Sequence, residues 1–303
     1  MTGFTSLLPP RPVANVVQDP KKPIRVPTTP PPISAMIREN MTLSSWLLVG
    51  GLIQGIAIHL LGPRALIPTT IAILYRVLDH LLMACKITRN RYMDNVLQTK
   101  FSGQYPRPNG SFSGTPAAES VVVFRLGARS NHPLGVLAPG MMTLGKYVKE
   151  MVRDMTADAE KYGVLGLSRW VKQEDPAGNE TMFLFYLRDY DGLHRFAHDK
   201  LHMDGLAWWT TIVKDHPHIS ILHETYVVPK GQWENIYINS KPTGMGDTWF
   251  PSRDKDGCVR ELVRSAVDAR SGALRSASKR LQMKWLEEVE KEQGELYDRT
   301  FTQ

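Results

Sequence analysis

Two apolar runs near the start of the chain predict helices that are long enough to cross a membrane. Residues 43–61 contain no formally charged side chain, and a helix needs ~20 apolar residues to cross a bilayer core. A Gly-Pro-Arg break at 62–64 precedes a second run, residues 65–87, which contains Arg76, Asp79 and His80. A charge inside a membrane is costly, but Arg76 and Asp79 are three residues apart and could pair on one face of a helix.

Three interpretations of these runs remain open: a helical hairpin with both ends in the cytosol, one span followed by an interfacial helix, and a buried soluble helix pair. Basic residues flank the zone on both outer sides, whereas only Arg64 lies between the runs. Because basic residues stay on the cytoplasmic side, this distribution favours the hairpin. We therefore expect a membrane anchor over residues 41–88, in an intracellular membrane assigned to the endoplasmic reticulum, with the following domain facing the cytosol.

The alternation of apolar and polar positions after residue 119 predicts an α+β domain over residues 120–246. Strands are expected at 120–126, 163–171, 181–186 and 218–228, and helices at 143–161 and 189–213, the second with a kink at Gly205. The order strand, helix, strand, strand, helix, strand is that of the ferredoxin-like split βαβ motif.

The segments around this domain have a composition that is atypical of a packed core. Residues 1–40 are rich in proline and predict an extended tail. Residues 89–119 are polar and rich in Gly, Pro and Ser, and predict a linker. Residues 257–298 are highly charged, with a basic half followed by an acidic half, and predict a helix that packs on the domain or on a partner chain.

Charge and cysteine content exclude some function classes and permit others. The formal net charge is +7, which permits contact with anionic lipid, but no nucleic-acid-binding module is recognisable and no nucleic-acid partner is expected. Cys85 and Cys258 form neither a disulfide framework nor a metal-binding pattern, and they favour a reducing compartment. A Gly-rich phosphate loop is missing, so a tightly bound nucleotide cofactor is not expected.

Histidines are concentrated in the second half of the predicted domain. His194, His198 and His202 recur at every fourth position of the second predicted helix, which places them on one face. Imidazole serves as a general base, a metal ligand or a haem ligand, but no spacing here demands a metal. A polar outer helix face is the equally simple alternative. In the strand that follows, His223 and Glu224 must point to opposite faces, so only one of them reaches a given cavity.

A long motif at the end of the domain resembles a known family. The motif residues are His223, Glu224, Thr225, Tyr226, Val228, Pro229, Gly231, Glu234, Asn235, Ile236 and Tyr237. They resemble a domain-of-unknown-function family of fungal monooxygenase-like proteins, which includes monooxygenases of the fumagillin-pathway type. That family is related to antibiotic-biosynthesis monooxygenases and, more distantly, to haem-containing aldoxime dehydratases. The resemblance implies a dimeric α/β-barrel fold, and hence a homodimer, with a substrate cavity between sheet and helices.

The leading hypothesis that this resemblance implies is a membrane-associated monooxygenase that uses O₂ on a lipophilic intermediate of fungal secondary metabolism, without a bound organic cofactor. Such a reaction needs a base and a dry apolar pocket. The catalytic candidates are His202, His223 and Glu224, with Glu224 or Asn235 orienting the histidine. Trp208, Trp209 and Tyr226 are expected to line the pocket, and Asn235 is counted with the substrate-binding residues.

Two alternatives belong to other function classes. The first is a haem-dependent monooxygenase or dehydratase in which His198, His202 or His223 is the axial ligand. The second is a non-catalytic, membrane-tethered binding or scaffold protein that uses the charged C-terminal helix.

Overall fold

The computed structural model describes residues 3–17, 23–27, 41–172 and 180–283. The described residues divide into two compact units: a helical unit, residues 41–96, and a main unit, residues 3–17, 23–27, 97–172 and 180–283. Each unit is described by itself.

The helical unit is a hairpin of two helices, α2 (Leu43–Leu61) and α3 (Leu66–Ala84), joined by the 3₁₀ turn η1 (Gly62–Ala65). The helix predicted over 43–61 is confirmed at both ends. Each helix has 19 residues, which corresponds to about 28 Å and so to the thickness of a bilayer core. The described stretch Leu43–Ala84 is long and apolar enough to cross a membrane. An 18-residue window within it has a mean hydropathy of 1.6, and no residue of that window is buried.

The predicted pairing of Arg76 with Asp79 in the helical unit is wrong. Asp79 instead accepts hydrogen bonds from both terminal nitrogens of Arg91, one of them at 3.1 Å. The chain folds back after α3 through Lys86, whose φ is 59°, and this brings the 3₁₀ turn η2 (Arg91–Met93) against the helix. A bidentate guanidinium–carboxylate pair is stronger than a pair along one helix face.

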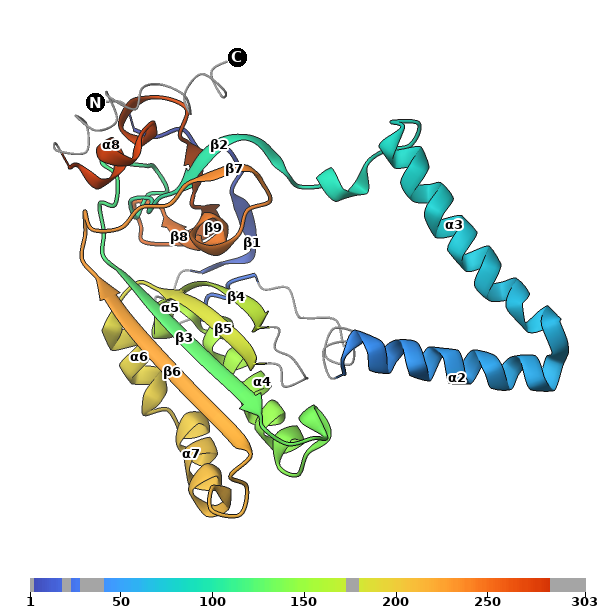
Figure 1. Ribbon diagram of the computed structural model, residues 1–303. Helices are drawn as coiled ribbons and strands as arrows, with labels where there is room; N and C mark the ends of the chain where they lie inside the picture. Colours follow the sequence, from blue (N-terminus) through green and yellow to red (C-terminus); the bar gives the residue numbers. More distant parts are fainter. Residues whose placement is uncertain (1–2, 18–22, 28–40, 173–179, 284–303) are drawn as a thin grey trace. The chain divides into compact units, whose positions relative to one another are not determined.

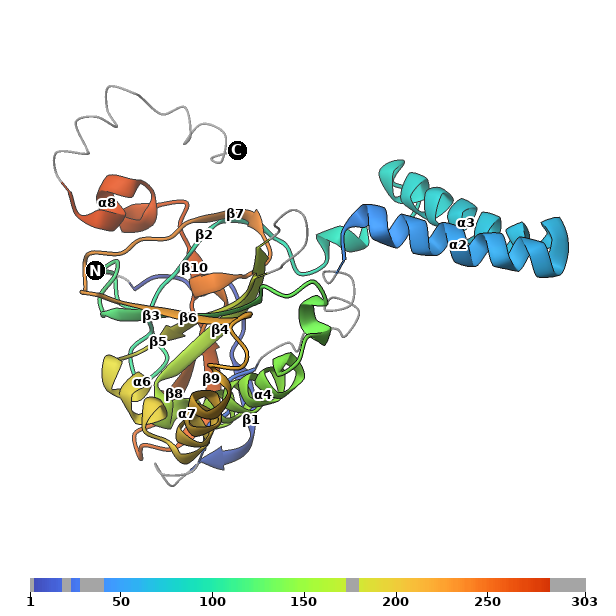
Figure 2. The ribbon, with the colours of Figure 1, turned by 60° about the horizontal axis from the view of Figure 1, so that its bottom comes forward.

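The main unit contains a four-stranded antiparallel sheet in the order β4-β5-β3-β6. Its elements follow the chain as β3 (Val121–Ser130), α4 (Met141–Ala157), α5 (Ala159–Tyr162), β4 (Val164–Lys172), β5 (Glu180–Leu187), α6 (Tyr190–Ala197), α7 (Lys200–Ile212) and β6 (Ile219–Val228). This topology confirms the ferredoxin-like α+β domain. The four helices α4 to α7 cover one face of the sheet, which we call the helix face, and none of these four lies on the opposite face, which we call the open face (Figures 1 and 2).

The main core lies between the sheet and its helices. Alternate residues of the central strands point into it, since side chains of a strand alternate between faces. Phe185 and Leu187 of β5 are fully buried, as is Val122 of β3, and they pack against Phe196 of α6 and Met155 of α4.

The helix predicted over 189–213 is two helices, and the kink predicted at Gly205 is wrong. The break lies at His198 and Asp199, where Asp199 caps the start of α7 by accepting a hydrogen bond from the amide of Leu201. Gly205 instead allows α7 to approach α4, because a Cβ there would lie 2.5 Å from the terminal carbon of Met151.

A second β layer corrects the linker prediction for residues 89–119. Residues Leu97–Gly103 form strand β2, which pairs with β7 (Tyr237–Ser240) and β10 (Ala266–Asp268). Phe101 of β2 is fully buried, and Tyr105, Phe112 and Ala117 are buried as well. Gly, Pro and Ser in this segment therefore mark turns of a packed layer, because its strands find their partners far along the chain.

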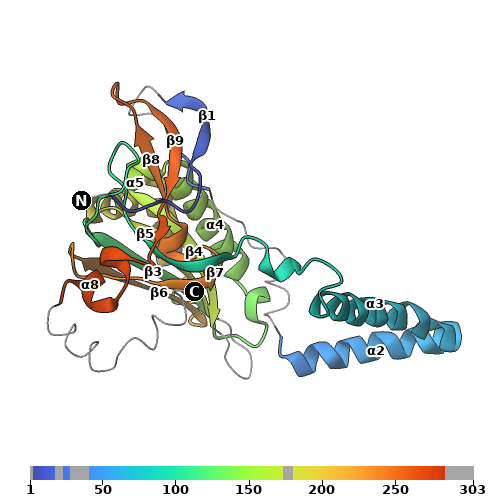
Figure 3. The ribbon, with the colours of Figure 1, turned by 90° about the horizontal axis from the view of Figure 1, so that it is seen from above.

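The predicted tail and the predicted C-terminal helix also contribute strands to a further three-stranded sheet of this layer, in the order β1-β9-β8. Arg11–Val17 forms β1, which pairs with β9 (Val259–Arg264), and β9 pairs with β8 (Trp249–Arg253) (Figure 3). The helix predicted over 257–298 is thus wrong for its first part, which contains β9, β10, the 3₁₀ turn η5 (Gly272–Leu274) and the short helix α8 (Ala277–Leu281). Its remainder, 284–298, lies outside the described residues, as do 18–22 and 28–40 of the tail.

Candidate functional site

The strand that carries the first half of the sequence motif sends its side chains to both faces of the sheet. In the pairing of β3 with β6, His223 is opposite Leu126 and Glu224 is opposite Arg125. Leu126 packs against the main core, so His223 lies on the helix face and Glu224 on the open face. The prediction that these two residues point to opposite faces is confirmed.

The predicted histidines of the helix face lie in separate surroundings. His202 is half-buried, with its Nδ1 2.8 Å from the carbonyl oxygen of Ala197 and its ring 5.2 Å from that of Phe196. His223 is exposed, with its ring 6.1 Å from that of Phe124. Buried aromatic and aliphatic side chains fill the adjacent layer, where the sequence led us to expect a substrate cavity.

The three histidines proposed as haem ligands have different surroundings. His198 is exposed at the end of α6, and its Nδ1 lies 2.9 Å from the carbonyl oxygen of His194. Buried side chains fill the core next to His202, whereas His198 and His223 are exposed at the surface. Among the described residues, no cluster of three His, Cys, Asp or Glu side chains is arranged to hold a metal ion.

The predicted pocket-lining residues are likewise distributed over both faces. Trp208 and Trp209 are half-buried on α7, where the Trp208 ring lies 5.3 Å from that of Tyr147 on α4. Tyr226 lies on the open face and is 53% exposed. The sheet therefore separates Tyr226 from the two tryptophans, and these three residues do not line one pocket.

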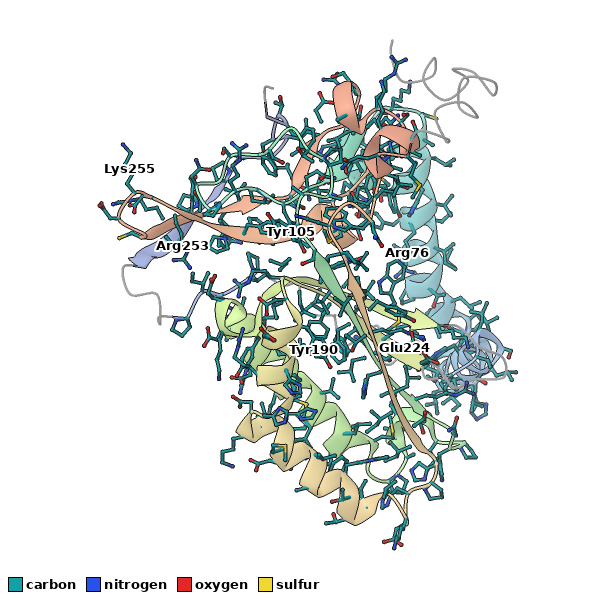
Figure 4. The ribbon with its side chains drawn as sticks, turned by 90° about the vertical axis from the view of Figure 1, so that its left-hand side faces the viewer. Arg76, Tyr105, Tyr190, Glu224, Arg253 and Lys255 are labelled. Atoms are coloured by element: carbon teal, nitrogen blue, oxygen red, sulfur yellow. The ribbon has the colours of Figure 1, made fainter. Side chains whose placement is uncertain are left out.

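A hollow of about 380 Å³ lies on the open face of the sheet. Its walls are Arg125 of β3, Trp170, Val171 and Lys172 of β4, and Glu180, Met182 and Leu184 of β5. The register places Arg125 opposite Leu184 and Trp170 opposite Met182, so these side chains share one face. In Figure 4 the sheet separates Glu224 from Tyr190, which lies on the helical side. The hollow therefore has four apolar and three charged lining residues, the charged ones being Arg125, Glu180 and Lys172.

Arg125 is the centre of a hydrogen-bonded network beside the hollow. Its guanidinium donates to Glu180 at 2.7 Å and to Glu224 at 3.0 Å, and its Nε lies 2.7 Å from the sulfur of Met182. The Tyr226 hydroxyl donates to the second oxygen of Glu224 at 2.8 Å. The side chain of Glu180 is only 11% exposed, against 43% for Glu224, which makes Glu224 the more displaceable partner of the arginine.

The same contacts set the ionisation of the two motif residues. The hydrogen bond from Tyr226, followed by that from Arg125, lowers the pKa of Glu224. The bond to Glu224 in turn raises the pKa of the Tyr226 phenol. At neutral pH the network therefore contains an ionised Glu224 and a protonated Tyr226, because hydrogen bonds to a charged form favour that form.

The second β layer closes one end of the open face. Tyr105, Trp233 and Phe250 of this layer form a buried cluster with Val121 of β3 and Leu165 of β4. The uncovered part of the open face is therefore the part that contains Arg125 and the hollow.

The second half of the motif builds this layer instead of the hollow. The Asn235 amide accepts a hydrogen bond from the Gly103 amide at 2.6 Å and donates to the Gly103 carbonyl at 3.0 Å. Glu234 pairs with Arg280 of α8, which is buried, and the Trp233 indole donates to the Glu119 carbonyl at 2.7 Å. The hydrogen bonds of Asn235 thus hold β2, and do not orient either histidine.

Sequence reasoning missed the residues that surround the hollow, Arg125, Glu180, Trp170 and Met182. Arg125 was visible as the one charge inside the apolar run 121–126, and an arginine in a buried strand usually has a carboxylate partner. Its partners come from two other strands, which only the pairing of the sheet could identify.

Comparison with known proteins assigns a family. A model of the "Monooxygenase af470-like" family matches residues 121–245. Monooxygenase af470 of Aspergillus fumigatus is 33% identical over 253 residues, which cover 82% of this chain and 90% of that protein. The chain belongs to the monooxygenase af470-like family. The hypothesis of an enzyme, a monooxygenase, is thereby confirmed over that of a non-catalytic scaffold.

Solved structures show more distant similarity to this family member. An aldoxime dehydratase in complex with butyraldoxime is 13% identical with a TM-score of 0.35, covering 60% of this chain and 42% of that one. The chain therefore spans less than half the length of that dehydratase. An antibiotic-biosynthesis monooxygenase from Bacillus cereus is 14% identical with a TM-score of 0.22, covering 36% of this chain and 93% of that one.

Proposed function

We propose that this member of the monooxygenase af470-like family oxidises a lipophilic intermediate of fungal secondary metabolism that binds in the hollow on the open face. The observation that supports this most is the composition of the hollow. The side chains of Trp170, Met182 and Leu184 provide apolar walls, and Val171 borders the hollow. Arg125 and Glu180 form one hydrogen-bonded network at its side, and Lys172 adds a further charge. Binding sites for small apolar molecules have this character, since a few polar groups orient a ligand that apolar walls hold.

The network around Arg125 suits the first step of a reaction in which the substrate itself reduces O₂. A substrate oxygen replaces Glu224 at the guanidinium of Arg125, and Glu224 accepts the acidic proton of the substrate. The electron pair of the broken bond stays on the substrate, where the positive charge of Arg125 stabilises it. Among the proposed acid–base residues, Glu224 is the one bonded to a wall of this hollow, so this mechanism assigns the proton to Glu224 instead of His202 or His223.

Membrane association and dimerisation complete the proposal. The uncharged helix α2 and the exposed apolar surface of α3 support an anchor in a bilayer, from which a lipophilic substrate could be taken. A homodimer formed through the uncovered part of the open face would close the hollow against water. The size of the protein in a mild detergent, measured by light scattering, distinguishes a monomer from this dimer.

The test compares the turnover of two variants, one with a large side chain placed in the hollow and one with a large side chain placed on the helix face. Met182→Trp should reduce turnover of the native substrate at least about tenfold by occupying the site. Met203→Trp, at an exposed position of α7, should leave turnover unchanged. Glu224→Gln should reduce turnover because it removes the proton acceptor. Metabolites that accumulate in a deletion strain supply the native substrate.

The same assay distinguishes the two faces of the sheet. We expect His202→Ala and His223→Ala to retain turnover. Full activity of a folded Met182→Trp variant, together with loss of activity in either histidine variant, would place catalysis on the helix face and refute this proposal.

A further inference from the structure

The loop between β3 and α4 presents large apolar side chains to solvent. Leu134, Leu137 and Met142 are 55%, 68% and 72% exposed, and they lie on or beside the 3₁₀ turn η3 (Gly135–Leu137). Exposed apolar residues that are grouped in this way mark contact with a membrane or another molecule.

Hydrogen bonds to the start of β6 hold this loop in place. The amide of Asn131 donates to the carbonyl of His218 at 2.7 Å, and the His218 ring donates to the carbonyl of Pro139 at 2.9 Å. The Leu134 amide donates to the ring nitrogen of His132 at 3.1 Å, and Ala138 is buried. The loop is thus fixed at both ends, while its large apolar side chains are exposed.

The charges that follow the loop in the chain are basic, and the segment before β6 that packs on the loop adds one charge of each sign, Lys214 and Asp215. The sequence contains neither Asp nor Glu between Glu119 and Glu150, whereas Lys146 and Lys149 are exposed on the first turns of α4. An apolar tip next to basic residues matches an anionic bilayer surface, where the apolar side chains insert and the lysines contact the headgroups. A second copy of the same surface would place like charges against each other, which disfavours self-association.

The loop lies at the end of the sheet where the hollow also lies. Strand β3 ends at Ser130, opposite Ile219, and its Ala128 is opposite Thr181 at the start of β5. Strand β4 ends at the same edge, and its last residues Val171 and Lys172 are walls of the hollow.

We infer that residues 130–142 form a second membrane contact, which inserts Leu134, Leu137 and Met142 into the interface of an anionic bilayer. This contact is separate from the helical anchor, and it sets the end of the sheet that bears the hollow against the lipid. Its consequence for substrate entry rests on the proposed function, whereas the contact itself does not.

A fluorescent probe in the full-length chain tests the contact directly. After replacing both native cysteines by serine, Leu137→Cys is labelled with an environment-sensitive dye, and the protein is reconstituted with vesicles of phosphatidylcholine and phosphatidylserine. Lys255→Cys is the matched control, because it is exposed at the tip of the β8–β9 turn (Figure 4). We expect a blue shift and quenching by nitroxide-labelled lipid for the Leu137 probe and neither for the Lys255 probe.

Charge reversal gives the second readout. The double substitution Lys146→Glu and Lys149→Glu should reduce quenching of the Leu137 probe on anionic vesicles more than on phosphatidylcholine alone. The inference is overturned if both probes report water in the presence of vesicles, or if the protein does not float with them. It is also overturned if the shift appears without lipid as protein concentration rises, which would indicate self-association. None of these readouts involves turnover, so a failed activity test leaves them interpretable.

Discussion

Replacing Asn235 by alanine tests whether the second half of the family motif builds structure or binds substrate. The side-chain amide bonds both the N–H and the carbonyl of Gly103, a buried residue of β2. Each buried backbone group left without a partner costs about 1–3 kcal/mol. Because Asn235 is itself half-buried, water could replace part of this bonding, and we expect a total cost of about 3 kcal/mol.

Thermal unfolding of the full chain in a mild detergent, followed by tryptophan fluorescence, measures this cost. For a domain of this size, 1 kcal/mol lowers Tm by roughly 2–4 °C, so Asn235→Ala should lower Tm by roughly 6–12 °C. Gln232→Ala is the control, because Gln232 is exposed in the same segment and its loss should cost less than about 0.5 kcal/mol. An unchanged Tm combined with lost turnover would mean that Asn235 acts on the substrate, and the structural explanation would be incorrect.

Three further substitutions test packing and pH dependence. Gly192→Ala should destabilise the protein by about 2 kcal/mol or more, because its Cβ would lie 2.3 Å from the carbonyl oxygen of Tyr162. Gly145→Ala, in open space on α4, should stabilise it by about 0.5–1 kcal/mol. Two variants with the same melting temperature as the unsubstituted protein would contradict both expectations. The hydrogen bond from Lys161 holds the pKa of Asp199 below its ordinary value of 3.8. This carboxylate therefore stabilises the fold above about pH 4 and loses that effect as pH falls through the lowered pKa, so Asp199→Asn should flatten the acid limb of a stability–pH curve.

The sequence by itself determined the elements whose pattern is local. The uncharged run at 43–61 specified a helix with those bounds, and the strands of the ferredoxin-like domain followed from short β-branched and aromatic runs. The alternation within β6 also determined that His223 and Glu224 point to opposite faces. The family resemblance was correct because its motif is long and its residues are contiguous in sequence.

Only the tertiary structure decided which of these residues act together. Asn235 is hydrogen-bonded to Gly103, which is more than a hundred positions away in the sequence. The segment with the composition of a linker forms strand β2. Arg125 pairs with carboxylates of β5 and β6. Buried side chains of the main core occupy the helix face, where a cavity was expected. Local periodicity encodes which positions are buried in a helix or strand, but the pairing of distant strands depends on the packing of the whole chain.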